Sequence, residues 1–86
     1  MYSLLLKKSA EKELRKLPTN IRLAVTKKIQ ALKKDPYPNG VTKLRGADDL
    51  YRMRHTTYRI IYSVDNGELV VWIIKVAHRR EVYRDF

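Results

Sequence analysis

Residues 58–76 have the sequence YRIIYSVDNGELVVWIIKV, which carries the clearest secondary-structure signal in the chain. The Asn-Gly dipeptide at 66–67 lies between two runs rich in β-branched and aromatic residues, a pattern typical of a β-hairpin with a type I′ turn. In the first run, every second residue from Tyr58 to Val64 points to the same face. The second run, 69–76, is apolar on both faces, as expected of a central strand.

A third strand precedes this hairpin. In residues 51–54, Tyr51 and Met53 point to one face of the strand, and Arg52 and Arg54 point to the other. Tyr51 and Met53 are therefore expected in the core, and Trp72, in the apolar run at 69–76, is expected there too. The turn-rich loop at 36–40, PYPNG, separates these strands from the N-terminal part of the chain.

The N-terminal part predicts a strand and two helices. The apolar run at 2–7 is interpreted as a first strand, and Ser9 as the N-cap of a helix over about 10–17 that Pro18 ends. Thr19 or Asn20 is expected to cap a second helix, whose apolar residues recur at helical spacing. Asp35-Pro36 is expected to end it, because the residue before a proline avoids helical backbone angles.

The predicted order is thus β-α-α-β-β-β, an α+β fold. A small, antiparallel-dominated sheet is expected to carry the two N-terminal helices on one face. With 86 residues, the chain has room for a single domain spanning 1–86.

Composition narrows the function. The chain has 19 Lys and Arg against 9 Asp and Glu, a net charge of +10, and no cysteine. Disulfide scaffolds are excluded, and the charge indicates a polyanionic partner. The longest apolar run has six residues, against about 20 for a membrane span, so no membrane association is expected and the protein is predicted to be cytoplasmic. His55 and His78 have no third ligand at zinc spacing, so no metal site is predicted.

The basic residues are of two kinds. Residues 1–34 hold 10 basic and 2 acidic groups, and most of the basic ones are lysines predicted on helix surfaces, where they are either a phosphate-binding surface or a solvated face. In residues 51–86, all but one of the 7 basic groups are arginine, and four of the six tyrosines lie there too. Arginine binds phosphate bidentately and tyrosine stacks on unpaired bases, which favours RNA over duplex DNA.

Four segments together resemble one known family. They are KLRG at 43–46, LYRMR at 50–54, YRIIY at 58–62 and VAHRREVY at 76–83. Their order and spacing resemble the RelE/ParE superfamily of bacterial toxins, in particular its RelE branch, over essentially the whole chain. The resemblance implies a ribosome-dependent endoribonuclease, an mRNA interferase that cuts mRNA in the decoding site and inhibits translation. The RNA 2′-hydroxyl attacks the adjacent phosphate in that family, so neither a metal nor another cofactor is expected.

The resemblance also implies roles for individual residues. It assigns catalytic or RNA-facing positions to Arg52, Arg54, Arg59, Arg79 and Tyr83. Lys43, Arg45 and Arg80 are expected to bind RNA phosphates.

One departure affects the chemistry. Several relatives have lysine where this chain has Arg52 and Arg54, and arginine does not release its proton in proteins. Both arginines are therefore expected to stabilise charge, not to act as a base. His78, Tyr83 and Glu81 are the candidates for proton transfer, His78 foremost, because histidine changes charge closest to neutral pH.

Two other functions stay open. A ParE-type toxin would inhibit DNA gyrase without cutting RNA, and a non-catalytic module would only bind nucleic acid. The resemblance further implies a cognate RelB-like antitoxin as partner, beside the ribosome and mRNA. The positive charge predicts that this antitoxin is acidic and partly disordered, and that it either covers the arginines or displaces the C-terminal segment.

Overall fold

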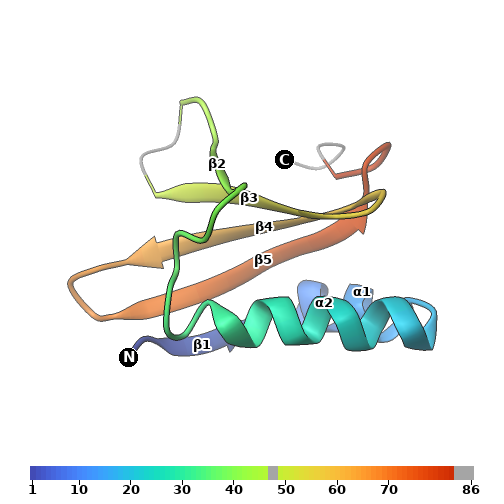
Figure 1. The fold of residues 1–86 in the computed structure, drawn as a ribbon, viewed down its shortest axis with the longest axis horizontal. Coiled ribbons are helices and arrows are strands. Elements are labelled where there is room, and N and C mark those ends of the chain that lie inside the picture. The colour runs from blue at the N-terminus through green and yellow to red at the C-terminus, as the bar shows by residue number, and fades with distance from the viewer. Residues whose placement is uncertain (47–48, 83–86) are drawn as a thin grey trace.

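Two helices cover one face of a five-stranded sheet in the computed structural model, which describes residues 1–46 and 49–82 (Figure 1). The elements are β1 (Ser3–Leu6), α1 (Lys8–Arg15), α2 (Thr19–Ala31), β2 (Thr42–Lys43), β3 (Leu50–His55), β4 (Tyr58–Asp65) and β5 (Val70–His78). The strand order is β1-β5-β4-β3-β2, with β1 parallel to β5 and the other neighbours antiparallel. The α+β prediction is confirmed, with the short β2 as an additional strand. None of the helices in the described part of the chain is long and apolar enough to cross a membrane.

The β4–β5 hairpin forms as predicted, but the predicted turn type is wrong. A type I′ turn needs positive φ at Asn66 and Gly67. The positive φ falls instead on Leu69, at 55°. The Asp65 carboxylate accepts hydrogen bonds from the backbone N–H groups of Gly67 (2.9 Å) and Glu68 (3.0 Å). These bonds form an Asx-type turn without the positive φ angles of a type I′ turn, and the connection extends over residues 66–69.

Both predicted helix caps are also wrong. Lys7 donates its N–H to the carbonyl of Ile73 at 3.0 Å and thereby continues the pairing of β1. The chain enters α1 directly after it, so Ser9 lies inside the first turn and Lys7 is the N-cap. Pro18 is the N-cap of α2, and neither N-cap residue makes a side-chain capping bond. Helix α2 ends at Ala31, before the predicted stop at Asp35-Pro36, and turns continue through Lys34.

The main core lies between the helices and the sheet. Alternate residues of β3 and β4, Met53, Ile60, Tyr62 and Val64, are buried in it, as their spacing predicts. Tyr62 is fully buried, and its hydroxyl donates to the carbonyl of Pro36 at 2.7 Å. Burial raises the pKa of Tyr62, with a smaller contribution from Tyr51. This bond ties the α2–β2 connection to the core.

Replacing Tyr62 with phenylalanine tests that tie. The change leaves a buried carbonyl without its partner, so we expect it to lower the free energy of unfolding by about 1–3 kcal/mol in urea titrations at pH 7. Because the folded-state pKa of Tyr62 is raised, its contribution is complete below about pH 10 and is lost as the pH rises further. The difference between parent and Tyr62→Phe should therefore shrink above about pH 10. Tyr58→Phe, at a half-buried position, serves as the control.

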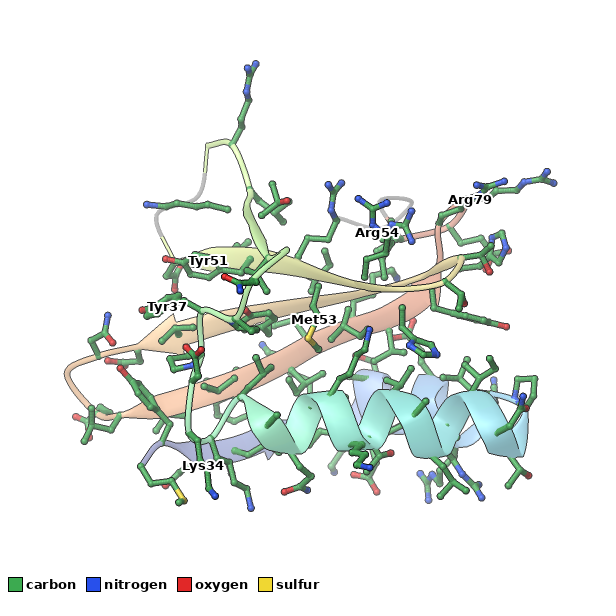
Figure 2. All side chains as sticks on the ribbon, viewed as in Figure 1. Lys34, Tyr37, Tyr51, Met53, Arg54 and Arg79 are labelled. Atoms are coloured by element: carbon green, nitrogen blue, oxygen red, sulfur yellow. The ribbon has the colours of Figure 1, made fainter. Side chains whose placement is uncertain are left out.

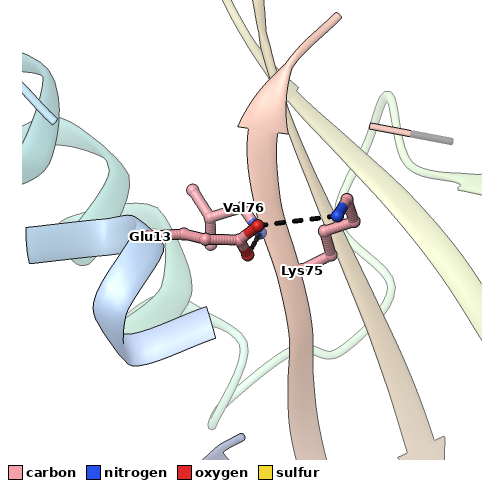
Figure 3. Close-up of polar contacts among 3 residues, drawn as sticks. All are labelled: Glu13, Lys75 and Val76. Atoms are coloured by element: carbon pink, nitrogen blue, oxygen red, sulfur yellow. Dashed lines mark hydrogen bonds and ion pairs between the residues drawn. The ribbon is translucent and has the colours of Figure 1, made fainter. Parts of the chain in front are cut away.

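The outer edge of β5 has an unusual cover. Strand β1 ends at Leu6, opposite Ile73, so β1 does not pair with the rest of β5. There Glu13 of α1 takes the place of a strand: its Oε1 accepts the N–H of Val76 at 2.9 Å, and its Oε2 lies 3.5 Å from Lys75 Nζ (Figure 3). The carboxylate thus satisfies a backbone donor and links the helix layer to the sheet edge.

Two substitutions separate the parts of this contact. Glu13→Ala removes the acceptor of the Val76 N–H and is expected to lower the free energy of unfolding by about 1 kcal/mol. Glu13→Gln keeps a neutral acceptor and should lose less than half of that, since partly exposed ion pairs contribute little. Chemical denaturation of both variants measures the difference. Equal losses in the two would show that the ion pair with Lys75 matters more than the hydrogen bond.

Candidate nucleic-acid interface

The sheet face away from the helices carries the basic residues. Because Met53 and Ile60 point into the core, their neighbours along the strands point to this opposite face. Cross-strand pairing arranges these neighbours in rows: Arg52 of β3, Ile61 of β4 and Lys75 of β5 form one, and Arg54, Arg59 and Ala77 form the next. We call these residues the arginine face.

Arg54 and Arg59 are directly opposite each other in the β3–β4 ladder. Like charges at opposed positions of a sheet repel, and a bound anion relieves that repulsion. Nη1 of Arg59 donates to the carbonyls of Thr56 and Tyr58, both at 3.0 Å. These bonds hold the guanidinium at the β3–β4 turn, where it is a positioned cation beside the exposed Arg54. The pair is suited to bind a phosphate.

The turn after β5 lies at the same end of the sheet. The backbone N–H of Arg79 donates to the carbonyl of Thr57 at 2.6 Å, which joins this turn to the β3–β4 turn. Figure 2 shows Arg54 and Arg79 at one end of the sheet, on the side away from the helices. The structure therefore brings Arg79 to the end of the arginine face that carries Arg54 and Arg59.

Two apolar residues are buried outside the helix-side core. Ile61 is fully buried and Val82 is 1% exposed, yet both lie outside the core cluster on the helix side. Figure 1 shows the chain after β5 folding over the side of the sheet away from the helices. We infer that Val82 anchors the turn to the arginine face.

His78 lies on the other face. It pairs with Tyr58, which alternates in phase with the core residues Ile60 and Tyr62, and the two rings meet edge to face with centroids 5.7 Å apart. Its Nδ1 accepts the backbone N–H of Arg80 at 3.3 Å. The structure thus does not group the His78 imidazole with the arginine face, where the sequence interpretation required it for proton transfer.

The other predicted residues are scattered. Lys43 pairs with Tyr51, so it lies on the helix-side face, and Arg45 lies in the turn after β2. Arg80 is exposed in the turn after β5. Tyr83 is outside the described residues.

Lys75 and Trp72 also lie on this side of the sheet, where the sequence interpretation did not place them. Lys75 stands in the same row as Arg52, although its ammonium group is turned to Glu13 over the sheet edge. Trp72, expected in the core, is 37% exposed on this face, so that prediction is wrong. The signal was its alternation with the buried Val71 and Ile73, which the uninterrupted apolar run of β5 concealed.

No group of three or more His, Cys, Asp or Glu side chains suited to a metal ion occurs within residues 1–46 and 49–82.

Comparison with known proteins identifies the family. Residues 4–83 match the family described as ParE toxin of type II toxin-antitoxin system, parDE. This chain belongs to the RelE/ParE superfamily of toxins. Its RelE-type character follows from its relatives. It is 36% identical to the mRNA interferase toxin RelE of Escherichia coli over 80 residues, 88% of this chain and 83% of that protein.

Two further similarities cover more of the RelE-type chains. Toxin RelG of Mycobacterium tuberculosis is 31% identical over 84 residues, 96% of this chain and 97% of that protein. The toxin chain in the crystal structure of the intact E. coli RelBE toxin-antitoxin complex superposes with a TM-score of 0.80 at 32% identity, covering 91% of this chain and 96% of that one. The fold of this chain is therefore that of the RelE toxins.

Proposed function

We propose that this RelE-type toxin is an endoribonuclease that cuts mRNA on the ribosome. The observation that carries the proposal is the opposed pair Arg54 and Arg59, with Arg52 on the same face and Arg79 at its end. The similarity to an E. coli protein named as an mRNA interferase supports the same chemistry. A ribosomal target also places the protein in the cytoplasm.

The proposed step is an internal transesterification. The RNA 2′-oxygen attacks the adjacent phosphorus, the bond from phosphorus to the 5′-oxygen breaks, and the products carry a 2′,3′-cyclic phosphate and a 5′-hydroxyl. The proton of the 2′-hydroxyl leaves during attack, and the departing 5′-oxygen gains one. Negative charge accumulates on the phosphate oxygens between these events, and guanidinium groups held beside them stabilise it. Arg54 and Arg59 supply these groups, and Arg52 and Arg79 align the strand on either side.

The proposal leaves two candidates for proton transfer. The imidazole of His78 is on the far face of the sheet, so direct transfer from it is not part of the proposal. Glu81, exposed in the turn that carries Arg79, and Tyr83 stay candidates from the sequence. Their contributions are separable by pH–rate profiles of single variants.

An antitoxin partner follows from the same similarity. The related E. coli toxin was crystallised in a toxin-antitoxin complex with RelB. We infer a cognate RelB-like antitoxin for this chain, and the net charge of +10 favours an acidic one. Its affinity should fall as salt is raised.

The test uses purified ribosomes. An mRNA positioned in the decoding site is incubated with the toxin, beside the same RNA free in solution. The proposal expects cleavage on ribosomes and little or none of free RNA. Equal cleavage of both would replace ribosome dependence by a general ribonuclease activity.

A second candidate is inhibition of DNA gyrase. The matching family description, which names ParE, favours it. Supercoiling by purified gyrase in the presence of the toxin decides between them. Inhibited supercoiling together with intact mRNA would establish this alternative.

A further inference from the structure

Exposed apolar side chains lie on the same side of the sheet as the arginine face, at the opposite end from Arg54 and Arg59. Two rows before Arg54 and Arg59, pairing aligns Leu50, Ser63, Trp72 and Leu5 across four strands. Trp72 is 37% and Leu5 42% exposed, so an aromatic and an aliphatic side chain stand open on the same surface as the arginines. Neither side chain belongs to the helix-side core.

Two lysines lie near this aromatic ring. Lys7 Nζ lies 6.0 Å from the centre of the Trp72 ring, within the range of a cation–π contact. Lys7 and Lys8 also line a groove of about 610 Å³ beside the ring, together with Leu6, Asp49, Leu50, Ser63 and Ile74. Its wall therefore combines a flat aromatic surface, a hydroxyl, two ammonium groups and one carboxylate, so its charged groups sum to one positive charge.

We propose that this groove binds a nucleobase of the RNA strand whose phosphates lie on Arg54 and Arg59. The base stacks on Trp72, and Lys7 and Lys8 bind the phosphate attached to it. An aromatic platform beside basic side chains is how proteins hold single strands without reading their sequence. This inference rests on the proposed function, because that function places an RNA strand on this face.

The alternation of the sheet connects the two places. Trp72 and Ala77, which is paired with Arg59, are five residues apart on β5, or roughly 16 Å along the strand. Row Arg52–Ile61–Lys75 lies between them on the same face. A strand of a few nucleotides is long enough to reach from the arginine pair to the groove, with Arg52 as the basic residue of the row between them.

An apolar antitoxin segment is the competing occupant. The positive groups argue against it as the main one, because Lys7 lies at the ring itself, where a purely apolar partner would have to bury an ammonium group. A nucleotide instead brings the phosphate that compensates this charge.

The single tryptophan makes the test direct. The full chain is titrated with a 2′-O-methyl RNA oligonucleotide of about six residues, which it cannot cut, and with an abasic strand of equal length and charge. We expect saturable quenching of Trp72 fluorescence by the base-bearing strand and much less by the abasic one. In anisotropy titrations, Trp72→Ala should bind the base-bearing strand about tenfold more weakly, while Trp72→Phe stays within about threefold of the parent. Leu23→Ala, at an exposed apolar position of α2, is the matched control and should not change the affinity.

The possible results distinguish the nucleobase groove from the proposed mRNA cleavage. Equal affinity for abasic and base-bearing strands, or a Trp72 signal that responds only to the antitoxin, would overturn the nucleobase groove. Cleavage on ribosomes without quenching would overturn the groove alone. Quenching by a parent protein that cuts no mRNA would support the groove and refute the proposed nuclease. Arg59→Ala should retain the quenching amplitude at saturation while losing cleavage.

Discussion

Alanine in place of Arg59 is expected to lower the rate of mRNA cleavage on ribosomes by about 10²–10³-fold. Two backbone carbonyls hold the guanidinium at the turn, and its Cα is paired with that of Arg54, so we expect little reorganisation when a phosphate binds. Charge stabilisation of this kind acts on the transition state more than on the bound substrate. Single-turnover rates at saturating toxin measure it, and binding to ribosomes should change by less than about tenfold.

Two variants control this result. Arg59→Lys keeps the charge but loses the bidentate geometry, so it should recover only part of the rate. Arg22→Ala removes a charge from α2, in the helix layer, and should leave the rate unchanged. A rate for Arg59→Ala within about threefold of the parent would remove Arg59 from the reaction.

Aspartate at position 82 should have the second largest effect. Val82 is 1% exposed in the turn that carries Arg79, and a carboxylate cannot stay buried there without a partner. We expect the turn to detach from the sheet and the cleavage rate to fall by about tenfold to a hundredfold, because Arg79 is no longer held at the end of the arginine face. Cleavage assays on ribosomes measure the rate.

The helix-side core provides the internal check. Val82 is outside that cluster, so far-UV circular dichroism and the fluorescence of Trp72 should stay close to those of the parent. Val82→Ile keeps an apolar anchor and should retain most of the activity. Full activity in Val82→Asp would show that the turn needs no anchor, whereas global unfolding would show that Val82 belongs to the main core.

The sequence predicted most of the fold, because local signals and side-chain alternation agree. Alternation alone separated Met53 and Tyr62 from Arg52 and Arg54, and the structure keeps that division. Errors arose where a specific hydrogen bond, local in one case and long-range in the other, overrode the expected turn or cap. The Asp65 carboxylate changed the hairpin turn, and the pairing of Lys7 with β5 moved the start of α1.

The candidate site was less accessible to sequence reasoning. Which residues meet across strands depends on register, so the opposition of Arg54 and Arg59 emerges only from the paired sheet. The same register separates His78 from the arginines, although it is adjacent to Arg79 in the sequence. The pairing of β4 with β5 shifts by one residue between Ile61 and Tyr62, and this bulge interrupts the side-chain alternation of β5. The exposure of Trp72 was hidden because its neighbours in the sequence are all apolar.

The arrangement assigns different tasks to the two sides of this small sheet. The helix side supplies stability through Tyr62 and the other buried residues, and the opposite side presents positive charge. Among the described residues, Ile61 and Val82 are buried but lie outside the helix-side core. Substitution of Val82, in the turn after β5, should therefore alter activity at less cost in stability than substitution of Tyr62.

Removing one oxygen atom from the mRNA, the 2′-oxygen beside the scissile phosphate, tests directly whether that oxygen is the nucleophile. Ribosomes carrying an mRNA in the decoding site are compared with ribosomes whose mRNA has a 2′-deoxy residue on the 5′ side of the scissile phosphate, both in buffer with the toxin. The proposal predicts cleavage of the normal mRNA to a 2′,3′-cyclic phosphate and a 5′-hydroxyl, and none of the 2′-deoxy mRNA. Cutting of both, or of neither while gyrase is inhibited, would contradict it.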